Sequence, residues 1–183
     1  NSYVVIQGAL INEGSLLNSS GQVTFTSTSS VSGSGDTTFD NVVISGDFTA
    51  TSGTMTIDGD FQNSGTFNAN GGTVVFSGTS SISSSQPVTF NNLAINGTVT
   101  APSTTLGITG SLVNNGTFNA NGGTVAFSGT TTLSGTSATS LNNVTISGML
   151  NASGTTRVSG NFVNNGTFNP GSGTIVFNGT TTI

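Results

Sequence analysis

Hydrophobic residues of this chain occur in short alternating runs and not at helical spacing. In the clearest runs they lie two residues apart, as Val125 and Phe127 do, while Thr124 and Ala126 occupy the positions between them. A period of two is the spacing of a β-strand, whose successive side chains point to opposite faces. Val, Ile, Phe and Thr also favour strands. The pattern therefore predicts an all-β protein built from many short strands.

The hydrophobic pattern returns at a nearly fixed interval. The segment "VNNGTFNANGGTVAF" at 113–127 has two close copies, "QNSGTFNANGGTVVF" at 62–76 and "VNNGTFNPGSGTIVF" at 163–177, and a diverged one, "INEGSLLNSSGQVTF" at 11–25. The copies are offset by 51, 51 and 50 residues. Ten aligned columns hold only apolar residues: Ile6/Ile57/Ile108/Val158, Leu10/Phe61/Leu112/Phe162, Leu16/Phe67/Phe118/Phe168, Val23/Val74/Val125/Ile175, Phe25/Phe76/Phe127/Phe177, Val31/Ile82/Leu133/Ile183, Phe39/Phe90/Leu141, Val42/Leu93/Val144, Ile44/Ile95/Ile146 and Phe48/Val99/Leu150. We expect these columns to form the core, with the following phenylalanines at its centre: Phe67, Phe118, Phe168, Phe76, Phe127 and Phe177.

Glycine recurs between the predicted strands at constant positions of the repeat. One such column is Gly14/Gly65/Gly116/Gly166, and another is Gly59/Gly110/Gly160. A glycine that returns at one phase is expected where the chain turns sharply. The strands are therefore separated by tight corners.

Two architectures fit a train of short strands and corners, a β-sandwich of hairpins and a solenoid in which each coil pairs in parallel with the coil before it. Regular recurrence favours the solenoid, because stacked coils need the same residue type at the same place. A repeat of 50–51 residues then contains either two coils of about 25 residues or three of about 17. We take 1–183 as a single β-solenoid domain, with repeat copies near 14–64, 65–115 and 116–165 and partial copies at 1–13 and 166–183.

Composition excludes several functions. Only 4% of the residues are charged, Arg157 is the one basic residue, and His and Cys are absent. Phosphate neutralisation is therefore not available, which argues against a nucleic-acid partner. A zinc site and a Cys or His nucleophile are likewise excluded. The chain has no apolar run of 18 or more residues, so we expect no membrane insertion, and we expect neither an enzyme nor a cofactor.

Two motifs, "FNNLAINGTVT" at 90–100 and "NGGTVVFSGT" at 70–79, resemble the Gly/Asn/Thr-rich β-helix arrays of large bacterial surface proteins, such as adhesin stalks and autotransporter-type passenger domains. The likeness covers nearly the whole chain but includes no diagnostic site. It implies a right-handed parallel β-helix, an extracellular or cell-surface location, and a structural or adhesive role.

The acidic residues lie in the first third of the chain, and Asp58 and Asp60 are the weak candidates for a calcium site. Aligned copies have neutral residues in their place, since Asp60 matches Ser111 and Asn161. We therefore interpret the acids as solvated corner residues. The same carboxylates could form a glycosidase pair, but the chain lacks the basic and aromatic residues that hold a polysaccharide.

Asparagine also recurs in columns. Stacked amides that hydrogen-bond along a fibre axis reinforce cross-β packing. We therefore expect an Asn ladder at Asn41, Asn92, Asn143, Asn63, Asn114 and Asn164.

A threonine column, Thr28/Thr79/Thr130/Thr180, is followed two residues later by Ser30/Ser81/Thr132/Thr182. A flat Thr array is one way in which a solenoid binds ice, and this is the alternative function. The column recurs once per repeat and not once per coil, which argues against it.

The predicted function is structural and non-enzymatic: a solenoid that assembles end to end into a filament, or the rod-like stalk of an adhesin. The first segment, "YVVIQG" at 3–8, and the last residues carry no recognisable cap. We therefore expect the partner to be a second copy stacked head to tail or flanking repeats of a longer chain, since uncapped solenoid ends expose strand edges. Cell-surface or matrix carbohydrate is a further possible partner.

Overall fold

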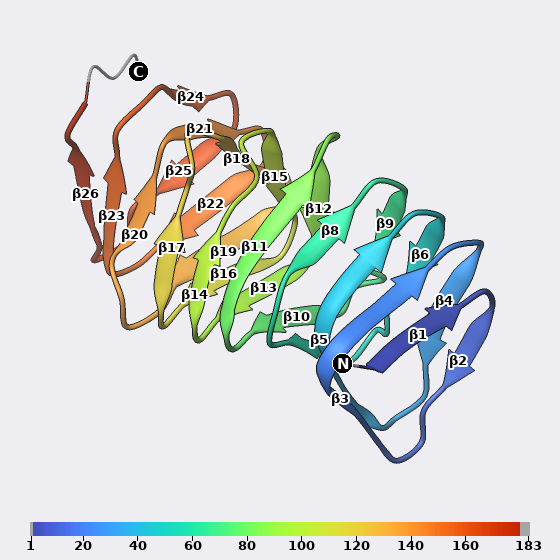
Figure 1. Cartoon of the computed structure of the whole chain (residues 1–183). Helices are drawn as coiled ribbons and strands as arrows, with labels where there is room; N and C mark the ends of the chain where they lie inside the picture. Colours follow the sequence, from blue (N-terminus) through green and yellow to red (C-terminus); the bar gives the residue numbers. More distant parts are fainter. Residues whose placement is uncertain (1, 180–183) are drawn as a thin grey trace.

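The computed structural model describes residues 2–179 and shows a parallel β-solenoid of about nine coils, each of roughly 19 residues (Figure 1). Every ladder between neighbouring strands in the described range is parallel, and each strand pairs with strands of the coils next to its own, as β13 does with β10 and β16. The prediction of an all-β parallel solenoid is therefore confirmed, and the sandwich alternative is excluded.

The coil is triangular in plan and has three faces. Face 1 consists of β1 (Ser2–Ile6), β8 (Phe61–Asn63), β11 (Thr79–Ser84), β14 (Thr98–Thr100), β17 (Thr117–Asn119), β20 (Thr139–Leu141), β23 (Thr155–Val158) and β26 (Thr174–Phe177). Face 2 consists of β2 (Ala9–Ile11), β4 (Ser29–Ser32), β6 (Asp47–Thr49), β9 (Thr66–Asn68), β12 (Val88–Phe90), β15 (Thr105–Ile108), β18 (Thr124–Phe127), β21 (Asn143–Ile146) and β24 (Phe162–Asn164). Face 3 consists of β7 (Thr54–Ile57), β10 (Thr73–Phe76), β13 (Asn92–Ile95), β16 (Ser111–Asn114), β19 (Thr130–Ser134), β22 (Met149–Ala152) and β25 (Thr167–Asn169). The two long strands β3 (Ser15–Phe25) and β5 (Asp36–Ile44) run from face 3 round the corner into face 1.

The coil length differs from both expected values. Val74 pairs with Leu93 and Leu93 with Leu112, so one coil in this column is 19 residues long. A coil of 17 or 25 residues is therefore wrong. The repeat covers more than two coils and fewer than three, because it does not contain a whole number of them.

Repeat copies consequently turn around the rod. The equivalent strands β10, β18 and β26 are eight strands apart and lie on faces 3, 2 and 1 in turn (Figure 1). At about 4.8 Å per coil, each repeat advances about 13 Å along the axis. The expectation that equivalent residues of successive repeats stack on one another is therefore wrong. Each residue stacks on a neighbour from another part of the repeat, as Phe67 does on Phe48 and Phe118 on Val99.

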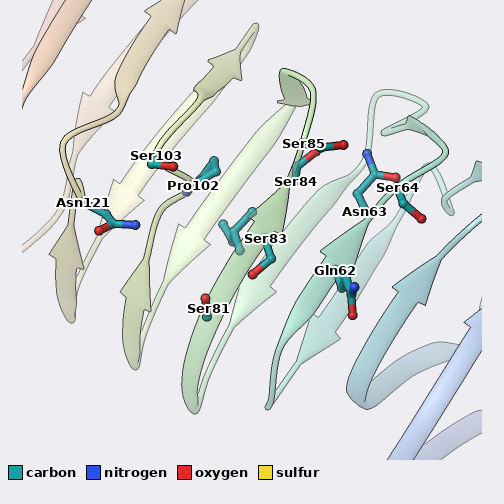
Figure 2. Close-up of a pocket in the computed structure, with 11 residues that line it drawn as sticks. Gln62, Asn63, Ser64, Ser81, Ser83, Ser84, Ser85, Pro102, Ser103 and Asn121 are labelled. Atoms are coloured by element: carbon teal, nitrogen blue, oxygen red, sulfur yellow. The ribbon is translucent and has the colours of Figure 1, made fainter.

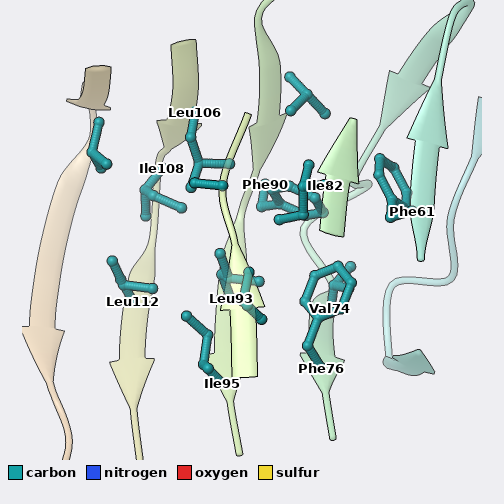
Figure 3. Packing of buried hydrophobic residues seen from close by; sticks show 14 of the residues in the cluster. Phe61, Val74, Phe76, Ile82, Phe90, Leu93, Ile95, Leu106, Ile108 and Leu112 are labelled. Atoms are coloured by element: carbon teal, nitrogen blue, oxygen red, sulfur yellow. The ribbon is translucent and has the colours of Figure 1, made fainter. Parts of the chain in front are cut away.

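The core is nevertheless continuous, because every inward column is apolar over most of its length. Strands such as β10 and β18 alternate between buried and half-buried residues, as the period of two predicts. Figure 3 shows side chains from all three faces meeting in the lumen. Phe25 and Phe48 stack with their ring centroids 3.8 Å apart. Burial of these side chains supplies the main driving force for folding.

The six expected core phenylalanines are covered to different degrees. Phe76 and Phe127 are fully buried and Phe118 is 5% exposed, while Phe67 and Phe168 are partly buried. Phe177, in β26, is 40% exposed.

Corner glycines allow the coils to approach each other closely. A Cβ on Gly116 would lie 1.9 Å from the carbonyl oxygen of Gly97 in the preceding coil, and one on Gly65 would lie 2.1 Å from that of Gly46. No side chain fits in these positions. The glycine columns therefore mark places where backbone packs directly on backbone.

Candidate functional site: the polar corners

The asparagines of one column form a turn at the end of a strand. The side-chain Oδ1 of Asn12, Asn63, Asn114 and Asn164 accepts a hydrogen bond from the backbone N–H two residues later, at 3.2 Å in all four copies. This is an Asx turn, in which the side chain replaces a backbone carbonyl. The column therefore builds corners.

Two members of this column also fix the corner of the next coil. Asn114 is fully buried, and its Nδ2 donates to the carbonyl of Ala138 at 3.2 Å and to the Thr139 hydroxyl at 3.3 Å. Asn12 donates in the same way to the Asp36 carbonyl, at 2.9 Å, and to the Thr37 hydroxyl. A buried amide needs such partners, because an unmade hydrogen bond is costly there.

The second asparagine column joins adjacent coils. The Oδ1 of Asn92 accepts from the backbone N–H of Ser111 at 3.0 Å, and Asn41 and Asn143 make the same bond one coil onward. A Cβ on Gly110 would lie 2.5 Å from Asn92 Oδ1. Asparagine and glycine are thus required together at this contact.

The predicted Asn ladder is not the arrangement found for these six residues. Their amide oxygens bond backbone N–H groups, and members of a column lie on different faces because of the turning repeat, as Asn63 in β8 and Asn114 in β16 do. Asn-to-Asn bonds between adjacent coils occur elsewhere, at Asn96–Asn115 and Asn151–Asn169.

The weak metal candidates take part in other contacts. Asp58 Oδ1 accepts a hydrogen bond from the Ser77 hydroxyl, and Asp60 Oδ1 accepts from the backbone N–H of Ser81 at 2.8 Å. Within residues 2–179 no three acidic side chains come together as metal ligands. Glu13 binds Ser34 similarly: the Ser34 hydroxyl, and after it the Ser34 backbone N–H, lower the pKa of the Glu13 carboxyl.

The threonine column of the ice-binding alternative is spread over the rod. Thr79 stacks with Thr98 and Thr117 on face 1, whereas the column's next member, Thr130, lies on face 3 beside Met149. Thr180 and Thr182 lie outside the described residues. Each face thus carries short threonine rows and not one long array.

Two clefts are copies of one another. One has a volume of about 280 Å³ and is lined by Asn68, Asn70 and Asn91 together with five other residues. The other, of about 470 Å³, is lined by the equivalent amides of Asn119, Asn121 and Asn142. Their amides already have internal partners: Asn91 donates to the Gly71 carbonyl and Asn142 to that of Gly122, both at 2.8 Å.

A third cleft, of about 370 Å³, lies at the edge between faces 1 and 2 (Figure 2). It is lined by the ends of β8 and β11 and by the corner that follows β14. Its lining consists of six serines, three amide side chains and two apolar residues. Sequence analysis did not find this cleft, although the serine run at 83–85 interrupts the repeat there.

In the described range no helix is long and apolar enough to span a membrane. Comparisons of the chain with protein-family models, with curated proteins and with solved structures found no match.

Proposed function

We propose that this chain is a structural, non-enzymatic rod whose ends stack on further solenoid coils. The observation that carries the proposal is an unbroken series of parallel coils around one apolar core. Such an assembly is stiff along its axis, because each coil adds a ladder on every face. A nearly uncharged coat with a single basic residue offers few sites to trypsin-like proteases.

Both ends of the described solenoid present strand edges and apolar side chains. Within residues 2–179, β1 pairs only with β3, and at the other end β26 pairs only with β23. The inward side chain of Val4 is 40% exposed, and Phe177 in β26 is equally exposed. Open edges of this kind template pairing with another strand.

The covering coils come from a second copy of the chain, stacked head to tail. A heterologous contact of this kind does not close on itself and therefore gives an open filament. The same surfaces would also accept flanking repeats of a longer chain, which is the stalk form of the proposal. An extracellular surface setting, as in the bacterial arrays that the motifs resemble, suits either form.

A matched pair of lysine substitutions tests the stacking. Val4 points inward, in register with Val23, whereas Val5 points outward beside Thr24. Val4→Lys places an ammonium group in the contact, and burying an unpaired charge there is costly. We expect the wild type and Val5→Lys to form filaments whose length grows with concentration, and Val4→Lys to stay monomeric, as seen by negative-stain microscopy and sedimentation velocity.

A wild-type chain that stays monomeric at every concentration contradicts self-assembly and leaves the stalk. Equal assembly of both variants would show that the β1 end does not take part in the contact.

A further inference from the structure

The cleft between faces 1 and 2 contains a buried amide without a partner for its N–H groups. Asn63 is 5% exposed and lies at the end of β8, beside the serines of the cleft (Figure 2). Its Oδ1 accepts from the Gly65 N–H, as in the other copies. Among the described residues, however, its Nδ2 donates to no protein group. Buried donors are rarely left in this state.

The equivalent residues show what is missing. Asn12 and Asn114 each donate to one backbone carbonyl and one threonine hydroxyl of the next coil, the hydroxyls of Thr37 and Thr139. In the copy that contains Asn63, the threonine position is Val88, which has no acceptor. Asn63 thus lacks both the carbonyl and the hydroxyl that its counterparts use.

One residue accounts for the displaced carbonyl. In the other copies the chain turns at Gly33 and Gly135, with φ values of 103° and 129°, a region that favours glycine. The equivalent residue is Ser84, which instead continues β11 in extended conformation, and its hydroxyl donates to the Gln86 carbonyl at 2.7 Å. The following segment therefore takes another path, and a cleft opens above Asn63.

The chemistry of the lining selects the ligand. The six serine hydroxyls both donate and accept hydrogen bonds, as sugar hydroxyls do. No lining residue is charged, and the Asp60 carboxylate bonded to Ser81 disfavours an anion. Ile82 and Pro102 provide the apolar part of the lining. The volume of about 370 Å³ falls within the usual range for small-molecule sites.

We propose that this cleft binds a neutral 2-acetamido sugar, whose acetamido carbonyl and a neighbouring hydroxyl accept the two N–H groups of Asn63. The ligand thereby supplies the two acceptors that the protein provides in the other copies. The acetamido methyl group contacts Ile82 and Pro102, and the serines bind ring hydroxyls. The site does not depend on whether the rods assemble end to end.

NMR titration of the ¹⁵N-labelled full chain tests the proposal with two trisaccharides. N,N′,N″-triacetylchitotriose carries the acetamido groups, and cellotriose has the same β-1,4-linked backbone without them. We expect millimolar triacetylchitotriose to shift the amide resonances of 81–85 and of Ser103, and cellotriose to bind at least about tenfold more weakly, the loss expected for one hydrogen bond. Equal binding of the two sugars, shifts elsewhere only, or no binding of triacetylchitotriose overturns the proposal.

Variants at the cleft provide a second test. Ser84→Gly combined with Val88→Thr introduces the residues of the other copies, so the variant should fold while giving Asn63 its internal acceptors. We expect this variant and Asn63→Ala to lose at least about tenfold in affinity for triacetylchitotriose. Val88→Ala changes the same side chain without supplying an acceptor and should keep the binding. Unchanged affinity in the double variant contradicts the proposal.

Discussion

Gly116→Ala should destabilise the solenoid by about 3 kcal/mol, the upper part of the range for overpacking. The added Cβ would lie 1.9 Å from the Gly97 carbonyl oxygen, and no flexible side chain is available to move. The two coils must separate, which stretches the 2.9 Å hydrogen bond from the Thr117 N–H to the same carbonyl. Urea denaturation should show the lower stability, and hydrogen exchange should place the loss in β14 and β17.

Gly53→Ala is the matched control in a neighbouring part of the rod. A Cβ there would have only an ordinary contact, 3.5 Å from Thr51 Oγ1, and the equivalent position carries Thr104. We expect its stability to change by no more than about 0.5 kcal/mol. If both alanines were tolerated equally, the coils would not be as close as the structure places them.

Asn114→Ala should cost about 3 kcal/mol, because it leaves several buried groups without partners. The substitution removes two donated bonds, to the Ala138 carbonyl and the Thr139 hydroxyl, and the bond from the Gly116 N–H. It also leaves a cavity in a fully buried position. Urea denaturation measures the cost, and hydrogen exchange should localise it to the ladder between β16 and β19.

Asn63→Ala removes the same side chain from the position where only the turn bond exists. Its cost should therefore be close to about 1 kcal/mol, the worth of one hydrogen bond. An equal cost for both substitutions would mean that the Asn63 amide has partners like those of Asn114, and would remove the basis for the ligand site.

The fold class could be predicted from the sequence because it depends on local patterns. Alternation of residues such as Val125 and Phe127 predicts strands, and recurrent glycines predict corners. Coil length could not be derived in the same way. Almost every inward position is apolar, so shifts of 17, 19 or 25 residues all superpose apolar residues on apolar ones.

The turning of the repeat around the rod escaped prediction for a related reason. Identical residues in successive copies suggested direct stacking, as in the phenylalanine column of Phe67 and Phe118. Stacking requires only that neighbours be compatible in size and polarity, and Phe67 meets this requirement beside Phe48. A repeat of eight strands on a coil of three gives every copy similar surroundings after it turns to the next face.

The polar sites could be predicted only in part. Recurrence marked Asn114 as structural, but its partners depend on which coil lies next to it. The cleft at Asn63 has a sequence signal in the departures from the repeat: Ser84 replaces a glycine, and Val88 replaces a threonine. Such departures become interpretable once the stacking register is known.

Disulfide formation between introduced cysteines tests the stacking register most directly, because the chain has no cysteine of its own. Thr98 and Thr117 are paired neighbours on face 1, whereas Met149, the repeat equivalent of Thr98, lies on face 3. Neighbouring strands about 4.8 Å apart suit disulfide geometry. Under mild oxidation of dilute protein, Thr98→Cys/Thr117→Cys should form an intramolecular disulfide and Thr98→Cys/Met149→Cys should keep free thiols. The reverse result would contradict a 19-residue coil around which the repeat turns.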